Sequence, residues 1–160
     1  MSEFERLLED LKRDEGTKKL GESFVPYKCP AGKWTIGWGH NLEAWGIPAS
    51  LVPGILSGVG ITQAQAYSLL YADAVAAEQA VKTCIGTTWT KLDPVRQNVL
   101  TNMCFNLGAA KFTEFTQTIL AIRRRDFYEA AAQMVKSAWY NQTGVRAKRL
   151  VSEMLTGVRA

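Results

Sequence analysis

Residues 27–40 have the sequence YKCPAGKWTIGWGH, and this stretch decides how the first third of the chain folds. Aromatic and β-branched residues, which favour strands, dominate it, and Pro30-Ala31-Gly32 interrupts them where a tight turn is expected. We therefore predict a small antiparallel sheet over residues 24–40. The stretch also carries a thiol, a hydroxyl and the only imidazole of the protein, at Cys29, Thr35 and His40.

Helices are predicted on both sides of this sheet. The pattern Ser2-x-x-Glu5 is a capping box, and apolar residues recur after it with helical spacing, which predicts a helix over residues 2–13. Glu15 follows at its end. The pattern Thr62-x-x-Gln65 is a second capping box, and it predicts a long helix over residues 62–83.

Four further helices are predicted in the second half of the chain. Asp93 precedes a proline, as at many helix starts, and Gly108 closes the helix that it begins. A shorter helix is expected over residues 115–124. Asp126 is expected to cap the next helix and Thr143 the last one.

This order of elements predicts an α+β fold in a single domain over residues 1–160. Residues 14–61, approximately, form a small β-containing lobe near the N-terminus. Residues 84–160, together with the helix over 2–13, form a larger helical lobe. The long helix joins the two lobes, and we expect a cleft between them, because ligands commonly bind in such clefts.

Composition narrows the class of protein. The 160 residues are 47% hydrophobic and 21% charged, which is typical of a globular chain that buries a sizeable core. A net charge of +4 predicts attraction to polyanions such as nucleic acid, anionic lipid or bacterial wall, without selecting one of them. The three cysteines contain no CxxC pair, so neither a zinc site nor a disulfide framework is expected. We also expect no secretory signal and no membrane anchor.

Two glutamates are candidates for a general acid. Glu15 lies beside apolar residues at a helix end, where desolvation can keep a carboxyl group protonated near neutral pH. Glu22 lies closer to Cys29 in the sequence and competes for the role. The alternative for Glu15 is a solvent-exposed carboxylate without a catalytic role.

Cys29, Thr35 and His40 are the other reactive candidates. Whether the side chains of Cys29 and Thr35 share a face depends on whether the turn between them inserts or drops one residue. A thiol with an imidazole also fits a cysteine peptidase, although such nucleophiles usually lie at a helix N-terminus. Asp73 is a plausible partner that would give His40 a structural role instead.

Aromatic and basic side chains leave alternatives open as well. Five aromatic residues are able either to stack on sugar rings or to pack in the core: Tyr27, Trp34, Trp38, Trp45 and Phe105. The basic runs at 123–125 and 146–149 suit phosphate binding or solvated helix faces, and no nucleic-acid motif accompanies them.

Four blocks of sequence, in the same order along the chain, resemble the phage-type lysozymes (endolysins, glycoside hydrolase family 24). They are RDEG at 13–16, TIGWGH at 35–40, NMCFNLG at 102–108 and AWYNQTGVRAKR at 138–149. The resemblance implies a lysozyme-like α+β fold. It also implies a muramidase that hydrolyses the β-1,4 bond between N-acetylmuramic acid and N-acetylglucosamine in peptidoglycan, by an inverting mechanism and for host-cell lysis.

The resemblance implies catalytic roles for three residues. Glu15 matches the family's glutamate, Cys29 matches a position that holds Asp or Cys, and Thr35 matches the threonine six positions later. The chain departs from the family pattern in two ways: the segment between Glu15 and Cys29 is longer, and a cysteine stands where aspartate is usual.

The resemblance also implies supporting and binding roles. His40 and Asp73 match a buried pair, and Arg146 matches an arginine beside the catalytic glutamate. Three positions match residues that line the sugar-binding cleft: Phe105, Thr118 and Gln133.

The implied partner is bacterial peptidoglycan, with no metal or organic cofactor, no nucleic acid, no stable membrane anchor and a monomeric state. The protein is expected in the host cytoplasm, and it would act on the cell wall after a separate holin releases it. Two other functions stay open from the residues alone. One is a cysteine peptidase that cleaves peptidoglycan stems with Cys29 and His40, and the other is a non-catalytic basic module that binds wall or nucleic acid.

Overall fold

Two capping boxes fix the starts of the helices that flank the sheets. In the computed structural model, which describes residues 1–160, Ser2 and Glu5 exchange hydrogen bonds of 2.6 and 3.1 Å. Thr62 and Gln65 exchange hydrogen bonds of 2.8 and 3.2 Å. Helix α1 (Glu3–Asp14) and helix α3 (Gln63–Ile85) begin directly after these boxes. Each box satisfies backbone groups that a helix start otherwise leaves unpaired, so both predicted starts are confirmed.

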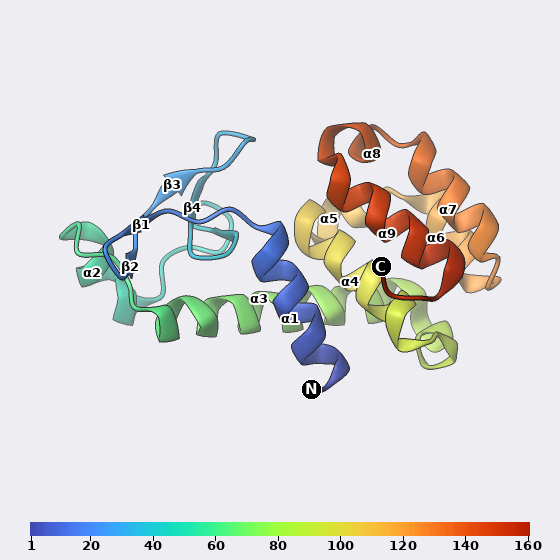
Figure 1. The fold of residues 1–160 in the computed structure, drawn as a ribbon, viewed down its shortest axis with the longest axis horizontal. Helices are drawn as coiled ribbons and strands as arrows, with labels where there is room; N and C mark the ends of the chain where they lie inside the picture. The colour runs from blue at the N-terminus through green and yellow to red at the C-terminus, as the bar shows by residue number, and fades with distance from the viewer. The chain divides into compact units, whose positions relative to one another are not determined.

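The chain forms two compact units, and Figure 1 labels their α-helices and most of their strands. Residues 8–73 make up the unit that contains all the strands, and residues 1–7 with 74–160 make up the helical unit. Helices α1 and α3 each contribute residues to both units. The predicted α+β class is confirmed, with small antiparallel sheets in the N-terminal region and a larger helical part.

The strands lie in two small antiparallel sheets. The larger sheet has the order β3 (Tyr27–Lys28), β4 (Trp34–Ile36), β5 (His40–Asn41). A shorter hairpin of β1 (Lys19–Leu20) and β2 (Ser23–Phe24) precedes it. The sequence prediction begins the sheet at residue 24 and misses β1, because a strand of two residues shows no alternation.

Five residues, 29–33, join β3 to β4. The Gly32 amide donates to the Cys29 carbonyl at 2.8 Å, and the Cys29 amide donates to the Lys33 carbonyl at 2.9 Å. Gly32 has a φ of +77°, which a residue with a Cβ rarely adopts. This pattern is that of a hairpin loop closed by a glycine bulge. The turn predicted at Pro30-Ala31-Gly32 is therefore confirmed.

Phe24 connects the strands to the rest of the residue 8–73 unit. Its backbone exchanges two hydrogen bonds of 2.8 Å with Ile61, and its side chain is fully buried. A Cβ at Gly60 would lie 2.4 Å from the Phe24 carbonyl oxygen, so only glycine fits there. The 3₁₀-helix η1 (Ala49–Leu51) and helix α2 (Val52–Leu56) precede this connection. The core of the unit consists of Phe24, Ile36, Leu51, Ile61, Ala66 and Leu69.

Aspartate side chains cap two helices of the helical unit, α4 and α7. The Arg96 amide donates to Asp93 at 2.9 Å, and the Glu129 amide donates to Asp126 at 3.0 Å, as the sequence predicts. The elements in chain order are η2 (Gly86–Lys91), α4 (Pro94–Leu107), α5 (Ala109–Thr113), α6 (Thr116–Arg123), α7 (Phe127–Lys136), α8 (Ala138–Thr143) and α9 (Val145–Thr156). They surround a core that includes Met103, Ile122 and Met134, each fully buried.

The prediction that Thr143 caps the last helix is wrong. Thr143 is the final residue of the short helix α8, which Ser137 caps by accepting a 3.2 Å hydrogen bond from the Tyr140 amide. Gly144, at φ +68°, then separates α8 from α9. A helix of six residues is too short for an apolar period of 3.6 to repeat, so the sequence pattern does not separate it from its neighbour.

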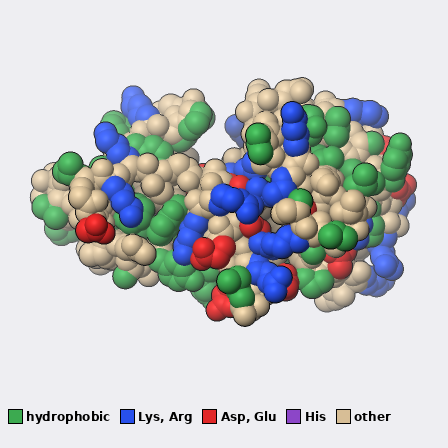
Figure 2. Space-filling view, viewed as in Figure 1, with side chains coloured by type: hydrophobic (Ala, Val, Ile, Leu, Met, Phe, Trp, Pro, Cys, Tyr) green, Lys and Arg blue, Asp and Glu red, His purple; other side chains and the backbone are tan.

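The surface carries charges of both signs. Figure 2 shows basic side chains in blue on both units, interspersed with acidic side chains in red. None of the helices combines the length and the hydrophobicity that crossing a bilayer requires.

Candidate active site

The strand register decides which hairpin residues share a face. Tyr27 pairs with Thr35 across β3 and β4, and residues paired in this way project from the same face of a sheet. Cys29 follows the end of β3, and the hydrogen bond of its amide to the Lys33 carbonyl continues the same register, so Cys29 projects to the side of Tyr27. Cys29 is half-buried and Thr35 is buried, with the Thr35 hydroxyl donating to the Lys33 carbonyl at 3.0 Å. The glycine-closed loop thus places Cys29 and Thr35 on one face, which the sequence alone left open.

Glu15 lies just past the end of α1. Its amide donates to the Leu11 carbonyl at 2.9 Å, which continues the hydrogen bonding of the helix. Glu15 is half-buried, and its carboxyl group packs against Gly39, where an added Cβ would lie 2.9 Å from Oε2 and 3.0 Å from Cδ. Glu22, the competing glutamate, is exposed in the turn between β1 and β2.

Tyr27 connects the segment after Glu15 to the hairpin. Its hydroxyl donates to the Gly16 carbonyl and also lies 3.5 Å from the Gly37 carbonyl. Burial raises the pKa of Tyr27 to about 12, the nearby charges of Glu15 and Cys29 add to the rise, and a hydrogen bond with the Gly39 backbone opposes it. Glu15 and Cys29 therefore both act electrostatically on the same hydroxyl group. The sequence suggests Tyr27 only as an aromatic surface, because its register opposite Thr35 depends on a turn geometry that the sequence leaves open.

His40 lies on the other face of the sheet. It pairs with the fully buried Ile36, whereas Thr35 pairs with Asn41. Its Nδ1 lies 2.8 Å from Asp73 Oδ2, and its Nε2 lies 3.2 Å from the Gly46 carbonyl oxygen. Burial lowers the pKa of His40, but the hydrogen bond and charge of Asp73, together with the Gly46 carbonyl, outweigh burial and raise it. Both ring nitrogens thus face acceptors, and the register does not bring the ring to Cys29.

We expect Asp73→Asn to lower the free energy of unfolding by about 2 kcal/mol at pH 5.5, because a buried imidazolium loses its charged partner. The raised pKa of His40 means that the ion pair stabilises fully below the unfolded value of 6.5 and that this contribution fades as the pH rises through the folded value. The difference from the parent protein should therefore shrink at pH 9. Urea unfolding at both pH values measures it.

Glu43→Gln is the control for this measurement. Glu43 forms an exposed ion pair with Lys33 at 3.4 Å, so its loss should change the unfolding free energy by less than about 0.5 kcal/mol. A difference between Asp73→Asn and the parent that is the same at pH 5.5 and pH 9 would contradict the charged state assigned to His40.

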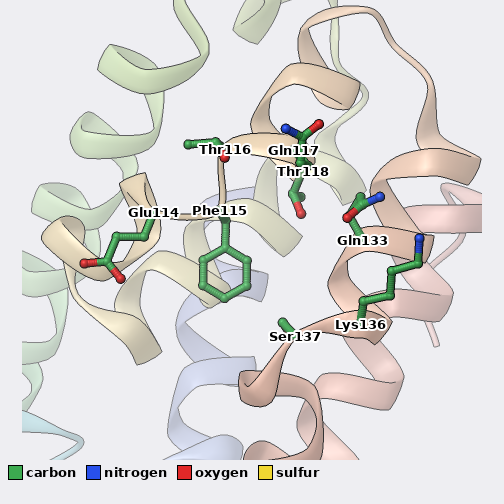
Figure 3. Close-up of a pocket in the computed structure, with 8 residues that line it drawn as sticks. All are labelled: Glu114, Phe115, Thr116, Gln117, Thr118, Gln133, Lys136 and Ser137. Carbon is green, nitrogen blue, oxygen red and sulfur yellow. The ribbon is translucent and has the colours of Figure 1, made fainter.

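The helical unit contains a pocket that two of the predicted binding residues line. The pocket has a volume of about 220 Å³, and Thr118 of α6 and Gln133 of α7 both line it (Figure 3). Thr118 is buried, and the Gln133 amide donates to Glu129 at 2.6 Å. The remaining lining residues are Glu114, Phe115, Thr116, Gln117, Lys136 and Ser137. The third predicted residue, Phe105, does not line the pocket, and it packs half-buried against the core of the helical unit.

The remaining candidates of the helical unit are held by hydrogen bonds or by burial. Arg146, in the first turn of α9, is 8% exposed, and its Nε donates to Asn102 Oδ1 at 2.8 Å. Burial, with a smaller contribution from Cys84, raises the pKa of the Cys104 thiol to about 12, so this cysteine stays protonated. All three cysteines are free, and no group of three or more His, Cys, Asp or Glu side chains is arranged to hold a metal ion.

Comparison with known proteins places the sequence in a family. The sequence model of the phage lysozyme family matches residues 17–153, a range that begins just after Glu15 and Gly16. The chain is 27% identical to "Probable T4-type lysozyme 2" of Dictyostelium discoideum, with 92% of each chain covered. It is 28% identical to "Pre-baseplate central spike protein Gp5" of Enterobacteria phage T4, with 94% of this chain and 28% of that protein covered. It is 32% identical to "Endolysin" of Acyrthosiphon pisum secondary endosymbiont phage 1, with 87% of this chain and 80% of that protein covered. The chain therefore belongs to the phage lysozyme family and is a glycoside hydrolase of the lysozyme type.

Proposed function

We propose that this protein is an endolysin that hydrolyses the β-1,4 bond between N-acetylmuramic acid and N-acetylglucosamine in bacterial peptidoglycan. The observation that carries the proposal is that Tyr27, which pairs directly with Thr35 in the sheet, donates its hydroxyl hydrogen bond to the carbonyl of Gly16, the residue after Glu15. An acid on one segment and a thiol with a hydroxyl on another are suited to act on the two ends of a breaking glycosidic bond.

The proposed reaction inverts the configuration at the anomeric carbon. Glu15 gives its proton to the leaving glycosidic oxygen as the carbon–oxygen bond breaks, and a water oxygen bonds to the anomeric carbon from the opposite side. The Thr35 hydroxyl donates a hydrogen bond to the Lys33 carbonyl. Its oxygen is therefore oriented to accept a hydrogen bond from that water. Cys29 lies on the same face and is the second group placed to orient the water. The proton that the water loses passes to solvent.

We assign substrate binding to the pocket of the helical unit. Thr118, Gln133 and Lys136 offer a hydroxyl, an amide and an ammonium group, and Phe115 offers an aromatic ring, which suits the polar sugars and stem peptides of peptidoglycan. Phe105 and Arg146 remain predicted contributors on the basis of the family match. The net charge of +4 favours adsorption to an anionic wall, an effect that salt weakens.

The family also supports a biological setting. We place the protein, as a monomer, in the cytoplasm of an infected bacterium until a separate holin releases it to the wall. Neither nucleic acid nor a membrane anchor has a part in this proposal.

Product analysis on purified peptidoglycan tests the proposal. We expect new reducing ends, no new amino termini, and an α-anomer as the first product in time-resolved NMR, because inversion converts the β-linked sugar to the α form. Cys29→Ala should lower the rate by about 10- to 100-fold, while Cys29→Asp should stay within about tenfold of the parent, because a carboxylate also accepts a hydrogen bond from water. Release of amino termini, or a Cys29→Asp variant as inactive as Cys29→Ala, would contradict it.

A further inference from the structure

We propose that Tyr27 is a positioning residue of the active site, whose hydroxyl holds the Gly16 carbonyl and thereby fixes Glu15 relative to the hairpin that carries Cys29 and Thr35. The inference rests on the proposed function, because it takes Glu15 as the general acid.

The segment after Glu15 has few other restraints. Helix α1 ends at Asp14, and the Glu15 amide makes the last hydrogen bond of the helical pattern. Gly16 is exposed, and an added Cβ there would meet no atom within 4 Å. The next backbone pairing is the 3.0 Å bond from the Val25 amide to the Lys18 carbonyl. The Tyr27 hydroxyl thus supplies the contact that ties this exposed junction to the hairpin.

Tyr27 is held firmly enough to serve as that tie. Its backbone is paired with Thr35 in the sheet, and its side chain is half-buried. Its hydroxyl also meets the Gly37 carbonyl and the Gly39 backbone, which belong to the loop between β4 and β5. The carboxyl group of Glu15 packs against Gly39 in the same loop. One hydroxyl group therefore joins the acid's segment, the hairpin and the loop on which the acid rests.

Tyr27 acts through geometry and not through its own titration. Its raised pKa of about 12 keeps the hydroxyl protonated over the whole range in which a lysozyme is assayed. A phenol can donate one hydrogen bond, and the Gly16 carbonyl oxygen accepts it. Removing the hydroxyl changes no charge, so the limbs of the pH–rate profile should stay where they are.

Tyr27→Phe tests the inference, because it keeps the ring and removes only the hydroxyl. We expect kcat on soluble peptidoglycan fragments to fall by about tenfold or more, since displacement of a catalytic group by a fraction of an ångström is costly. KM should change by less than about twofold, and Tm by about 2–4 °C, as for one lost hydrogen bond. Tyr128→Phe is the matched control, because Tyr128 is 75% exposed and its loss of a hydroxyl should change neither quantity.

A second arm asks whether Tyr27 acts through Glu15. In a Glu15→Asp background the acid is already displaced by one methylene, so Tyr27→Phe should cost less there than in the parent protein. An equal cost in both backgrounds, or a Tyr27→Phe kcat equal to that of Tyr128→Phe, would overturn the inference. Glu15→Gln separates the two levels of proposal. An active Glu15→Gln variant would contradict the proposed function. An inactive Glu15→Gln variant together with a fully active Tyr27→Phe variant would contradict only the role of Tyr27.

Discussion

Glu15→Gln is expected to lower the kcat for release of reducing ends by about 1,000-fold, the largest of the effects predicted for this protein. The carboxamide keeps the size and hydrogen-bonding capacity of the side chain but has no acidic proton to give to the leaving oxygen, and general acid catalysis contributes about 10² to 10⁴ to such rates. The measurement is the initial rate on purified peptidoglycan, with circular dichroism to show that the variant is folded. Tm should remain close to that of the parent, because the packing against Gly39 is retained.

Glu22→Gln is the matched control, since it makes the same chemical change at the competing glutamate. Glu22 is exposed in the β1–β2 turn, so its rate should stay within about twofold of the parent. If Glu22→Gln is inactive and Glu15→Gln is active, the acid has been assigned to the wrong residue.

The parts of this fold that the sequence predicts are those with local causes. A capping box involves residues three apart, and both predicted boxes form. The hairpin turn depends on Pro30, Ala31 and Gly32, which lie next to one another in the chain. Helix ends at glycine and starts at aspartate follow from the same local chemistry. These elements need no knowledge of what packs against them.

The missed elements are short. Strand β1 has two residues and helix α8 has six, so neither a period of 2 nor a period of 3.6 can repeat along them. Their stability comes from packing that the sequence does not display. The β1–β2 hairpin, for example, is attached to the unit through the pairing of Phe24 with Ile61, which lies 37 residues further along the chain.

The candidate site also combines features that the local sequence indicates with features that only the folded structure shows. Residue types and the family resemblance indicated Glu15, Cys29 and Thr35, but only the register shows that Cys29 and Thr35 share a face with Tyr27 and that His40 does not. The contacts of Tyr27 with Gly16 and of Glu15 with Gly39 join residues 11 and 24 positions apart, and no sequence period predicts them. The family resemblance groups Phe105 with Thr118 and Gln133, whereas the pocket includes only the latter two.

Gly39→Ala is expected to have the second-largest effect, a fall of about 100-fold in kcat. Gly39 has a φ of +80°, and an added Cβ would lie 2.9 Å from Oε2 and 3.0 Å from Cδ of Glu15, well inside normal contact. The methyl group must therefore displace the carboxyl group, and a displacement of about 1 Å is enough to cost 10²-fold in rate. The unfavourable φ adds a loss of about 1–2 kcal/mol in the free energy of unfolding, which urea unfolding measures.

Gly58→Ala separates the two consequences of the substitution. Gly58 has nearly the same backbone conformation, with φ +78°, but an added Cβ there meets no atom within 4 Å. Both variants should thus lose a similar amount of stability, while only Gly39→Ala should lose activity. If the two variants lose activity equally, the effect comes from backbone strain. If neither loses activity, the carboxyl group that rests on Gly39 is not the one that protonates the glycosidic oxygen, and the assignment of Glu15 has to be abandoned with it.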